Sequence, residues 1–198
     1  MKLPTLAAAA LTLLTTAEAV KNTTQEFRLK THVKPGQKGK AAYSDLYLEA
    51  YHTGAGLDDA VLVPKKKSGI KGFLNGTNGR EGDIKYQNVV FDLGTDFGWS
   101  LIMAGNVEFY SGWQPVQVNA GEGPSDPEGD SGFWFNGTGL QWTSNPEARP
   151  KSPTNEFGGW LVCDWWHGVP QLFFRLSYYD DYPAPKSCAD VYLCPEYI

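Results

Sequence analysis

A histidine followed by a glycine-rich segment is the first place in this chain where chemistry could occur. The segment His52–Gly56 has the sequence HTGAG, and two carboxylates, Asp58 and Asp59, follow it. An imidazole at His52 could act as an acid, a base or a metal ligand, and the glycines would let a ligand approach the backbone. The same composition suits a tight bend, because glycine tolerates positive φ and an aspartate side chain caps turns. We interpret the segment as a structural turn and keep His52 as a candidate ligand-binding residue.

A second cluster combines aromatic rings with a histidine and a carboxylate in the run Asp164, Trp165, Trp166, His167. Alternation assigns Trp165 to the same face as Cys163, and therefore to the core. An exposed Trp166 could stack on the apolar face of a sugar ring, while Asp164 and His167 bind its hydroxyl groups. The alternative is that these aromatic rings only fill the interior of a sheet. Asp164, Trp166 and His167 are therefore candidate carbohydrate-binding residues.

Motifs for catalysis or metal binding are weak. Asp126, Glu128 and Asp130 alternate in an acidic segment, but the glycine and closing glutamate of a full calcium loop are missing. Glu49 with either aspartate after the glycine turn could imitate a glycosidase pair, which would need a defined separation of the carboxyl groups. The chain has no nucleophile elbow, zinc-binding histidine pair or phosphate loop. We expect a non-enzymatic protein without a metal or cofactor, and glycan hydrolysis is the least favoured hypothesis.

Three cysteines, Cys163, Cys188 and Cys194, leave an odd count for pairing. A bridge between Cys163 and Cys188 would close a loop of about 25 residues and stabilise the fold by about 3 kcal/mol. Cys194 would then be free or paired with another chain. A bridge between Cys163 and Cys194 is the alternative.

Asparagines in N-glycosylation sequons occur at Asn22, Asn75 and Asn136. Asn75 and Asn136 are each followed by glycine, and Asn-Gly favours tight hairpin turns because both residues tolerate positive φ. We therefore predict glycan-bearing hairpin turns at Asn75 and Asn136.

Residues 1–19 have the pattern of a secretory signal peptide. Lys2 precedes an apolar run, and Ala17-Glu18-Ala19 matches the small-x-small cleavage pattern. We expect residues 20–198 to form a single β domain that is secreted to the extracellular space or the cell wall. No later segment reaches the roughly 18 apolar residues of a membrane helix, so we expect no membrane association.

The net charge of −5 argues against nucleic acid as a partner, because nucleic-acid binding needs a clustered basic face. The basic runs are Lys34–Lys40 and Lys65–Lys67. Both lie beside glycine or proline, and we interpret both as solvated turns.

The rest of the chain must position the candidate ligand-binding side chains. It has the pattern of an all-β protein, and the chain contains 22 glycines and 13 prolines. Apolar or threonine residues alternate with polar ones over residues 26–33, which predicts a half-buried strand. Further strands are predicted within residues 46–51, 60–63, 89–93, 116–118, 132–135, 140–143, 160–163 and 172–177, and residues 191–193 are also strand-like. Short strands separated by turn residues predict a single-domain antiparallel sandwich or closed barrel. The similarity of Phe73–Thr77 to Phe135–Leu140 adds a pseudo-symmetric β-trefoil as the alternative.

Several segments resemble a known family: residues 46–56 (LYLEAYHTGAG), 157–165 (FGGWLVCDW) with 170–173 (PQLF), and 187–191 (SCADV). They are similar to small secreted proteins of filamentous ascomycete fungi whose function is not established. Some of these proteins are labelled IgE-binding protein, which describes immune recognition and not activity. The resemblance covers most of the mature chain and implies no catalytic residues.

A looser similarity is to the C-terminal domain of fungal cell-wall glycoproteins. The matching positions are Leu74, Gly79, Arg80, Gly82, Ile84, Phe91, Gly132, Phe133, Cys163 and Cys188. The chain shows no repeat region before these positions and no lipid-anchor signal after them, so the resemblance does not extend to covalent wall attachment.

Together these patterns lead us to expect a secreted, N-glycosylated, non-enzymatic protein of a fungal cell surface or secretome. Its partner would be a cell-wall polysaccharide or a host protein. A carbohydrate-binding module is the alternative, and the sequence predicts no oligomeric state.

Overall fold

The computed structural model describes residues 25–64, 69–81, 83–104, 112–121, 132–144, 157–165, 168–176 and 183–198. This part of the chain forms twelve β-strands and one short 3-10 helix, η1 (Ala41–Tyr43), so the all-β prediction is confirmed. The strands are β1 (Phe27–Val33), β2 (Tyr47–Gly54), β3 (Leu57–Val63), β4 (Lys71–Glu81), β5 (Ile84–Asp92), β6 (Trp99–Met103), β7 (Trp113–Ala120), β8 (Phe133–Asn136), β9 (Gly139–Trp142), β10 (Gly159–Asp164), β11 (Pro170–Arg175) and β12 (Cys188–Tyr197). The predicted signal peptide and Asn22 lie outside the described residues, as do residues 122–131 and 145–156, which include Asp126, Glu128 and Asp130.

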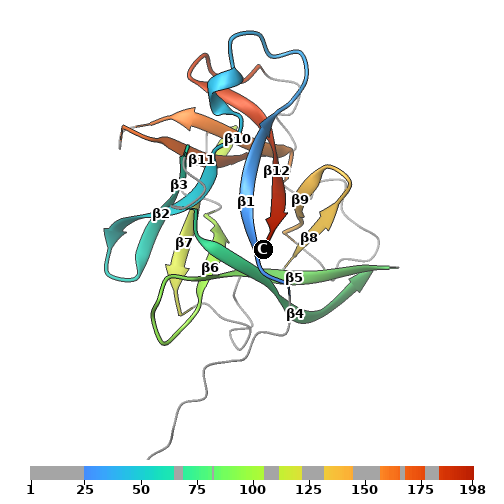
Figure 1. The fold of residues 1–198 in the computed structure, drawn as a ribbon. Coiled ribbons are helices and arrows are strands. Elements are labelled where there is room, and N and C mark those ends of the chain that lie inside the picture. The colour runs from blue at the N-terminus through green and yellow to red at the C-terminus, as the bar shows by residue number, and fades with distance from the viewer. Residues whose placement is uncertain are drawn as a thin grey trace, which may run out of the picture.

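The strands close into an antiparallel barrel, which confirms the closed-barrel form of the prediction (Figure 1). β1 and β12 lie side by side at its centre in Figure 1, in register from Phe27 opposite Tyr197 to Val33 opposite Val191. Closure pairs the backbone groups that an open sheet would leave unpaired at its edges.

The strand pairings repeat three times along the chain, in units β1–β4, β5–β8 and β9–β12. In each unit the second and third strands form a hairpin: β2–β3, β6–β7 and β10–β11. The third strands of the units pair with one another, β3 with β7, β7 with β11 and β11 with β3. The units are joined through β4–β5, β8–β9 and β12–β1. These pairings follow the threefold pattern of the β-trefoil alternative, but the pairing of β10 with β12 has no counterpart among the described residues of the first two units.

Matching strands of the three units contribute matching residues to one central core. The strand register matches Leu29 with Val89 and Leu140, Leu48 with Leu101, and Leu62 with Val118, and the third unit adds the paired residues Val162 and Leu172 to the same core. None of these side chains is more than 1% exposed. Burying each one stabilises the fold by about 1.5–3 kcal/mol before the entropy of ordering is subtracted.

A smaller apolar cluster covers the outer face of the third unit. It comprises Leu161 and Cys163 of β10, Phe173 of β11 and Cys188 of β12. Trp165 lies on this face and packs edge-to-face on Phe173, with ring centroids 5.2 Å apart. The prediction that Trp165 is a core residue is wrong, because it is 48% exposed. It follows the last residue of β10, where the sheet no longer covers it.

The sequence reasoning missed β4 and β6. Gly72, Gly76 and Gly79 lower the strand propensity of β4. Gly72 is nevertheless required there, because a Cβ at this position would lie 2.8 Å from the ring of Phe91 on β5. β6 is only five residues long and shows little alternation.

The two Asn-Gly segments differ in structure. Asn136 ends β8 and is followed by the two-residue turn Gly137-Thr138, so the hairpin turn is confirmed, but neither Asn136 nor Gly137 adopts the positive φ on which the prediction rested. Asn75 lies within β4 opposite Asn88, so the predicted hairpin turn at Asn75 is wrong. The pairing in that hairpin extends past Asn75 to Glu81 at the end of β4. Asn75 and Asn136 still occupy matching strands, β4 and β8, of the first two units.

Candidate functional site

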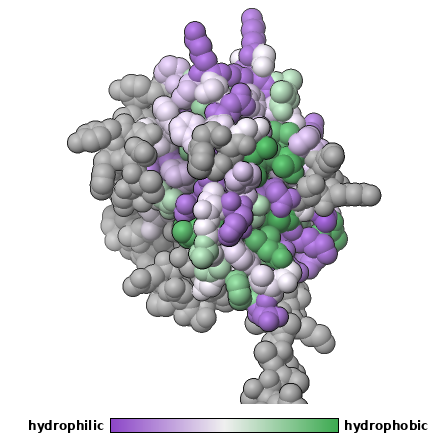
Figure 2. Space-filling model, turned by 90° about the vertical axis from the view of Figure 1, so that its left-hand side faces the viewer, coloured by the Kyte–Doolittle hydropathy of each residue, from purple (hydrophilic) through white to green (hydrophobic). Residues whose placement is uncertain are grey.

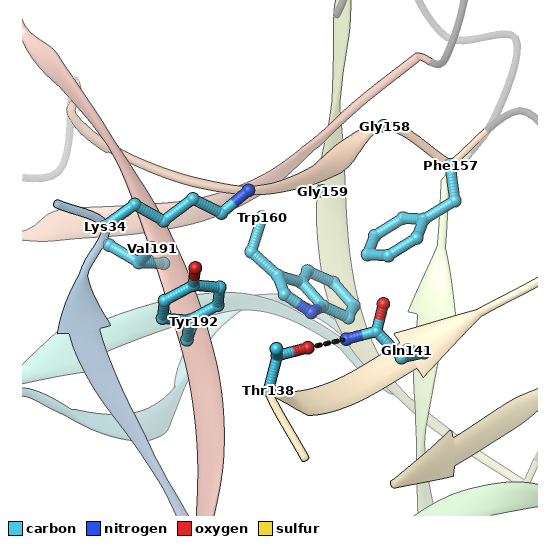
Figure 3. A pocket seen from close by; sticks show the side chains of 9 residues that line it. All are labelled: Lys34, Thr138, Gln141, Phe157, Gly158, Gly159, Trp160, Val191 and Tyr192. Atoms are coloured by element: carbon cyan, nitrogen blue, oxygen red, sulfur yellow. Dashed lines mark hydrogen bonds between the residues drawn. The ribbon is translucent and has the colours of Figure 1, made fainter. Parts of the chain in front are cut away.

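A pocket of about 270 Å³ lies in the third unit, where β9, β10 and β12 converge (Figure 3). We call it the aromatic pocket. Its residues come from the end of β1, the β8–β9 turn, β9, the segment leading into β10, and β12. They are Lys34, Thr138, Gln141, Phe157, Gly158, Gly159, Trp160, Val191 and Tyr192.

Aromatic rings form the apolar part of this pocket. Trp160 is only 2% exposed, and its indole N–H donates a 2.6 Å hydrogen bond to the carbonyl oxygen of Leu140. Phe157 packs edge-to-face on Trp160 with ring centroids 4.9 Å apart, and on Trp142 at 6.4 Å. Trp160 is held in place by its hydrogen bond and its packing. The Phe157 ring packs on it and therefore has a defined position in the pocket.

Lys34 and Tyr192 lie on the opposite side of the pocket from Phe157 (Figure 3). The Lys34 ammonium lies 5.6 Å from the centroid of the Tyr192 ring, a cation–π distance. Gly159 adopts φ +120°, and a Cβ there would lie 2.9 Å from Lys34 Nζ. Glycine is therefore required at position 159 for its backbone conformation and for the close approach of the Lys34 side chain.

Hydrogen-bonding groups line the side formed by the β8–β9 hairpin. The backbone N–H and the hydroxyl of Thr138 donate to Asn136 Oδ1 at 2.8 and 2.7 Å. Gln141 Nε2 donates to the Leu140 carbonyl at 2.9 Å and to Thr138 Oγ1 at 3.4 Å. No described residue donates to the Gln141 amide oxygen, so this oxygen can accept a hydrogen bond from a ligand.

The residues singled out from the sequence lie elsewhere. His52 is on the β2–β3 hairpin, which contributes no residue to the aromatic pocket. Its Nδ1 lies 3.0 Å from Asp58 Oδ1, with the His52 side chain 73% exposed and that of Asp58 7% exposed. Gly56 in this turn has φ +72°, so the turn interpretation of the glycine segment is confirmed.

The aromatic–histidine cluster is only partly described. Asp164 is exposed at the end of β10, and Trp166 and His167 lie outside the described residues. Burial, and the nearby Asp164 carboxylate, raise the pKa of Tyr43. Asp164 therefore interacts with the segment around η1 and does not line the aromatic pocket.

The pocket residues were not predicted because they come from four separate segments of the chain. The available signals were the pair Gly158-Gly159 before an aromatic residue, and Lys34 in a basic run that we interpreted as solvated. Neither signal indicates which distant segments would converge.

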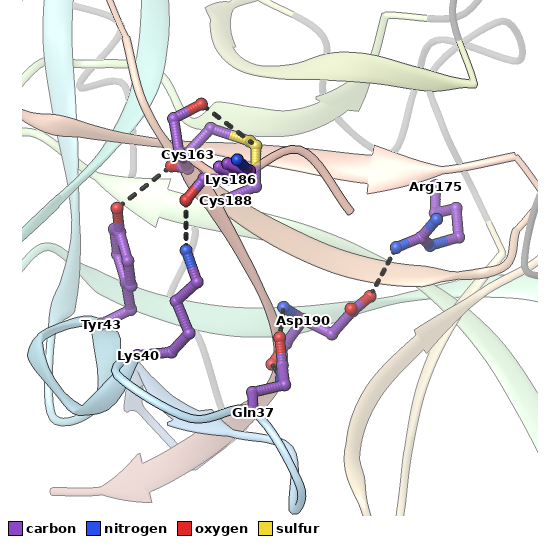
Figure 4. The surroundings of a disulfide bond; sticks show 9 residues. Gln37, Lys40, Tyr43, Cys163, Arg175, Lys186, Cys188 and Asp190 are labelled. Carbon is purple, nitrogen blue, oxygen red and sulfur yellow. Dashed lines mark hydrogen bonds and ion pairs between the residues drawn. A yellow bond between two sulfur atoms is a disulfide. The ribbon is translucent and has the colours of Figure 1, made fainter. Parts of the chain in front are cut away.

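A disulfide between Cys163 and Cys188 joins β10 to β12 (Figure 4). Cys194 is free and half-buried, with its sulfur 3.8 Å from the carbonyl oxygen of Thr138. Burial raises the pKa of the Cys194 thiol. The alternative pairing of Cys163 with Cys194 is therefore wrong.

Within the described ranges, no group of three or more His, Cys, Asp or Glu side chains could hold a metal ion. Nor does this part of the chain contain a helix of the length and apolar character needed to cross a membrane.

Comparisons with known proteins give one family. No curated protein and no solved structure matches the chain. A family described as a domain of unknown function, DUF7907, matches residues 24–197. The matched range includes all the strands of the barrel and all the residues that line the aromatic pocket. The chain therefore belongs to the DUF7907 family.

Proposed function

We propose that the protein is a secreted, non-enzymatic carbohydrate-binding protein and that the aromatic pocket holds one sugar residue. The observation that carries this proposal is the composition of the pocket. Phe157 and Tyr192 provide ring surfaces, and Thr138, Gln141 and Lys34 provide polar groups around them. Aromatic rings suit the apolar C–H face of a pyranose, and amides, hydroxyls and ammonium groups suit its hydroxyls.

The size of the pocket supports a small ligand. Small-molecule sites usually enclose roughly 300–1,000 Å³, and the volume of about 270 Å³ lies just below that range. One ring of a polysaccharide or a terminal sugar fits this description better than an extended ligand does. The partner would therefore be a glycan, such as a cell-wall polysaccharide, of which one residue enters the pocket.

The lining residues support binding rather than hydrolysis. The nine residues of the aromatic pocket include no carboxylic acid, whereas glycoside hydrolysis generally needs two placed carboxyl groups. Burial raises the pKa of Glu49, the carboxylate considered for a glycosidase pair. Glu49 lies on β2, which contributes nothing to the aromatic pocket.

Export and glycosylation complete the proposal. The signal peptide pattern at residues 1–19 and the resemblance to secreted ascomycete proteins support an extracellular or cell-wall location. Asn136 is exposed in the β8–β9 hairpin, two residues before Thr138 of the pocket lining. A glycan at Asn136 would lie at the rim of the pocket, so binding experiments need protein both with and without N-glycans.

The test is titration calorimetry of the purified mature protein with chitin, glucan and mannan oligosaccharides. We expect one of these to bind, and Tyr192→Ala to weaken the binding about tenfold. Tyr51→Ala is the matched control, since Tyr51 is 41% exposed on β2, outside the pocket. Absence of binding to all three and to the charged polysaccharides named in the next subsection, or equal losses in both variants, would contradict the proposal.

A further inference from the structure

A second hollow, of about 350 Å³, lies between the turn that follows β1 and the segment that leads into β12. Three of its lining residues are lysines, Lys38 and Lys40 from the turn and Lys186 from the later segment. We call it the lysine pocket. Lys40 Nζ donates a hydrogen bond to the carbonyl oxygen of Lys186, 146 residues further along the chain (Figure 4). The interpretation of residues 34–40 as a solvated turn explains why Lys38 and Lys40 are accessible. It does not explain why Lys186, from a distant segment, lies beside them.

The lysine pocket has an excess of positive charge. Asp190 is the one carboxylate among its lining residues. Arg175 Nη2 lies 2.9 Å from Asp190 Oδ1, and the Arg175 side chain is only 5% exposed, so this carboxylate is already paired. No described acidic side chain pairs with Lys38, Lys40 or Lys186. The lysine pocket therefore holds three ammonium charges that no described carboxylate pairs with, although Lys40 Nζ also lies 5.6 Å from the centroid of the Tyr43 ring.

The frame that carries these lysines is held by several contacts. Gln37 Nε2 donates to the Asp190 carbonyl at 2.6 Å, and the Asp190 N–H donates to Gln37 Oε1 at 2.8 Å. The Tyr43 hydroxyl donates to the carbonyl of Ser187 at 3.1 Å. The disulfide fixes Cys188 to β10. The backbone of the site is therefore arranged before any ligand binds, which lowers the entropy cost of binding.

The lysine pocket adjoins the aromatic pocket. Asp190 lines the lysine pocket, and the next two residues of β12, Val191 and Tyr192, line the aromatic pocket. Lys34 lines the aromatic pocket, and its backbone N–H donates to the Asp190 carbonyl at 2.9 Å. Figure 2 shows hydrophilic side chains projecting from the upper end of the molecule, the end at which Figure 1 places the turn after β1. One turn, residues 34–40, thus supplies cations to both pockets.

We propose that the glycan is acidic, and that the lysine pocket binds the carboxylate or sulfate groups of sugar residues next to the one in the aromatic pocket. This inference rests on the proposed carbohydrate-binding function and names its ligand class. A linear polysaccharide fits because it places a ring in one pocket and a charged group in the adjoining one. Lys34 gives the aromatic pocket itself a preference for an anionic ring over a cationic one.

The experiment compares polymers that share a backbone and differ in charge. One pair is polygalacturonate and its fully methyl-esterified form, which tests carboxylates. The other pair is dextran sulfate and dextran, which tests sulfates. We expect the charged member of at least one pair to bind about tenfold tighter or more, and this difference to shrink at high salt. Equal affinity within both pairs would overturn the inference.

Two triple variants separate a site from general attraction. Lys38→Gln, Lys40→Gln and Lys186→Gln together should weaken binding of the charged polymer about tenfold and leave binding of the neutral one unchanged. The control replaces Lys65, Lys66 and Lys67 with glutamine, which changes the net charge equally in a segment outside the described residues. Equal losses in both variants would mean attraction by net charge only, and would overturn the inference.

The Tyr192→Ala variant distinguishes failure of this inference from failure of the proposed function. If charged and neutral polymers bind equally and Tyr192→Ala weakens both, the proposed function is supported and the acidic preference is wrong. If binding of the charged polymer depends on the three lysines but not on Tyr192, the lysine pocket is supported and the role of the aromatic pocket is wrong.

Discussion

The first and third units of the barrel each contain a hairpin of their second and third strands, but they differ at the corner where their first, second and fourth strands meet. In the first unit β1 pairs with β2, whereas in the third unit β10 pairs with β12. In the first unit, side chains of β1 bridge to the segments that precede β2 and β4. Arg28 Nε donates to the Gly69 carbonyl at 2.9 Å, and Lys30 Nζ lies 2.7 Å from Asp45 Oδ1. The strand register matches Lys30 of β1 to Gln141 of β9, which in the third unit lines the aromatic pocket.

The third unit is held together by a covalent bond instead. The Cys163–Cys188 disulfide joins its second and fourth strands, and both of these strands line the aromatic pocket. Polar groups in this unit, such as the Gln141 amide oxygen, are therefore not needed to close the corner. The comparison teaches that one copy of a repeated unit can pair its strands differently and leave a pocket for a ligand, provided that other bonds stabilise that copy.

Removing the disulfide is the strongest test of this difference between the first and third units. Replacing Cys163 and Cys188 with alanine should lower the free energy of unfolding by about 3 kcal/mol, because the unfolded chain gains the freedom of an open loop. Urea denaturation followed by tryptophan fluorescence measures this change. We also expect weaker glycan binding, because β10 and β12 would no longer hold the aromatic pocket in one arrangement.

Cys194→Ala is the control for that experiment. Cys194 is half-buried and free, so its loss should change the free energy of unfolding by less than about 1 kcal/mol. If the Cys194 variant were destabilised as much as the double variant, the stabilisation could not be assigned to the disulfide.

A glycine-to-alanine change sharpens the comparison at the pocket itself. Gly159→Ala should cost about 1–2 kcal/mol of stability from its positive φ and should also displace Lys34, whose Nζ lies 2.9 Å from the added Cβ. Gly168→Ala is the matched control, since Gly168 has φ +75° but nothing within 4 Å of its Cβ. Thermal unfolding should fall in both variants, whereas binding of an anionic glycan should weaken only in Gly159→Ala. Equal binding by both would show that Lys34 does not contact the ligand.

Features of this fold that depend on neighbouring residues could be predicted from the sequence. Features that depend on distant segments coming together could not. Alternation located β1, and Asn136-Gly137 located the β8–β9 turn, because both depend on a few neighbouring residues. The same Asn-Gly pair failed at Asn75, because the β4–β5 pairing extends beyond it. The aromatic pocket depends on barrel closure bringing Lys34 beside Tyr192, and no local pattern encodes that pairing.

The smallest expected effect concerns the ion pair between Lys30 and Asp45 in the first unit. Asp45 accepts a hydrogen bond from Lys30 and is attracted by its positive charge. These two interactions hold the pKa of Asp45 below its ordinary value of 3.8. A carboxyl whose pKa is lowered by folding stabilises the fold above its unfolded-state pKa, and this contribution is lost as pH falls through the lower folded-state pKa. The contribution should therefore be present at neutral pH and should disappear in acid below about pH 3.8.

Asp45→Asn isolates the charge, because Asp45 has φ +62° and asparagine tolerates that backbone conformation equally well. Thermal unfolding measured by circular dichroism should show a slightly lower midpoint for the variant at neutral pH and equal midpoints in strong acid. Glycan binding should not change, since the first unit contributes only Lys34, just beyond β1, to the aromatic pocket. A difference in midpoint that persisted in strong acid would come from the backbone turn, and the ion pair would then have no part in holding the first unit's corner closed.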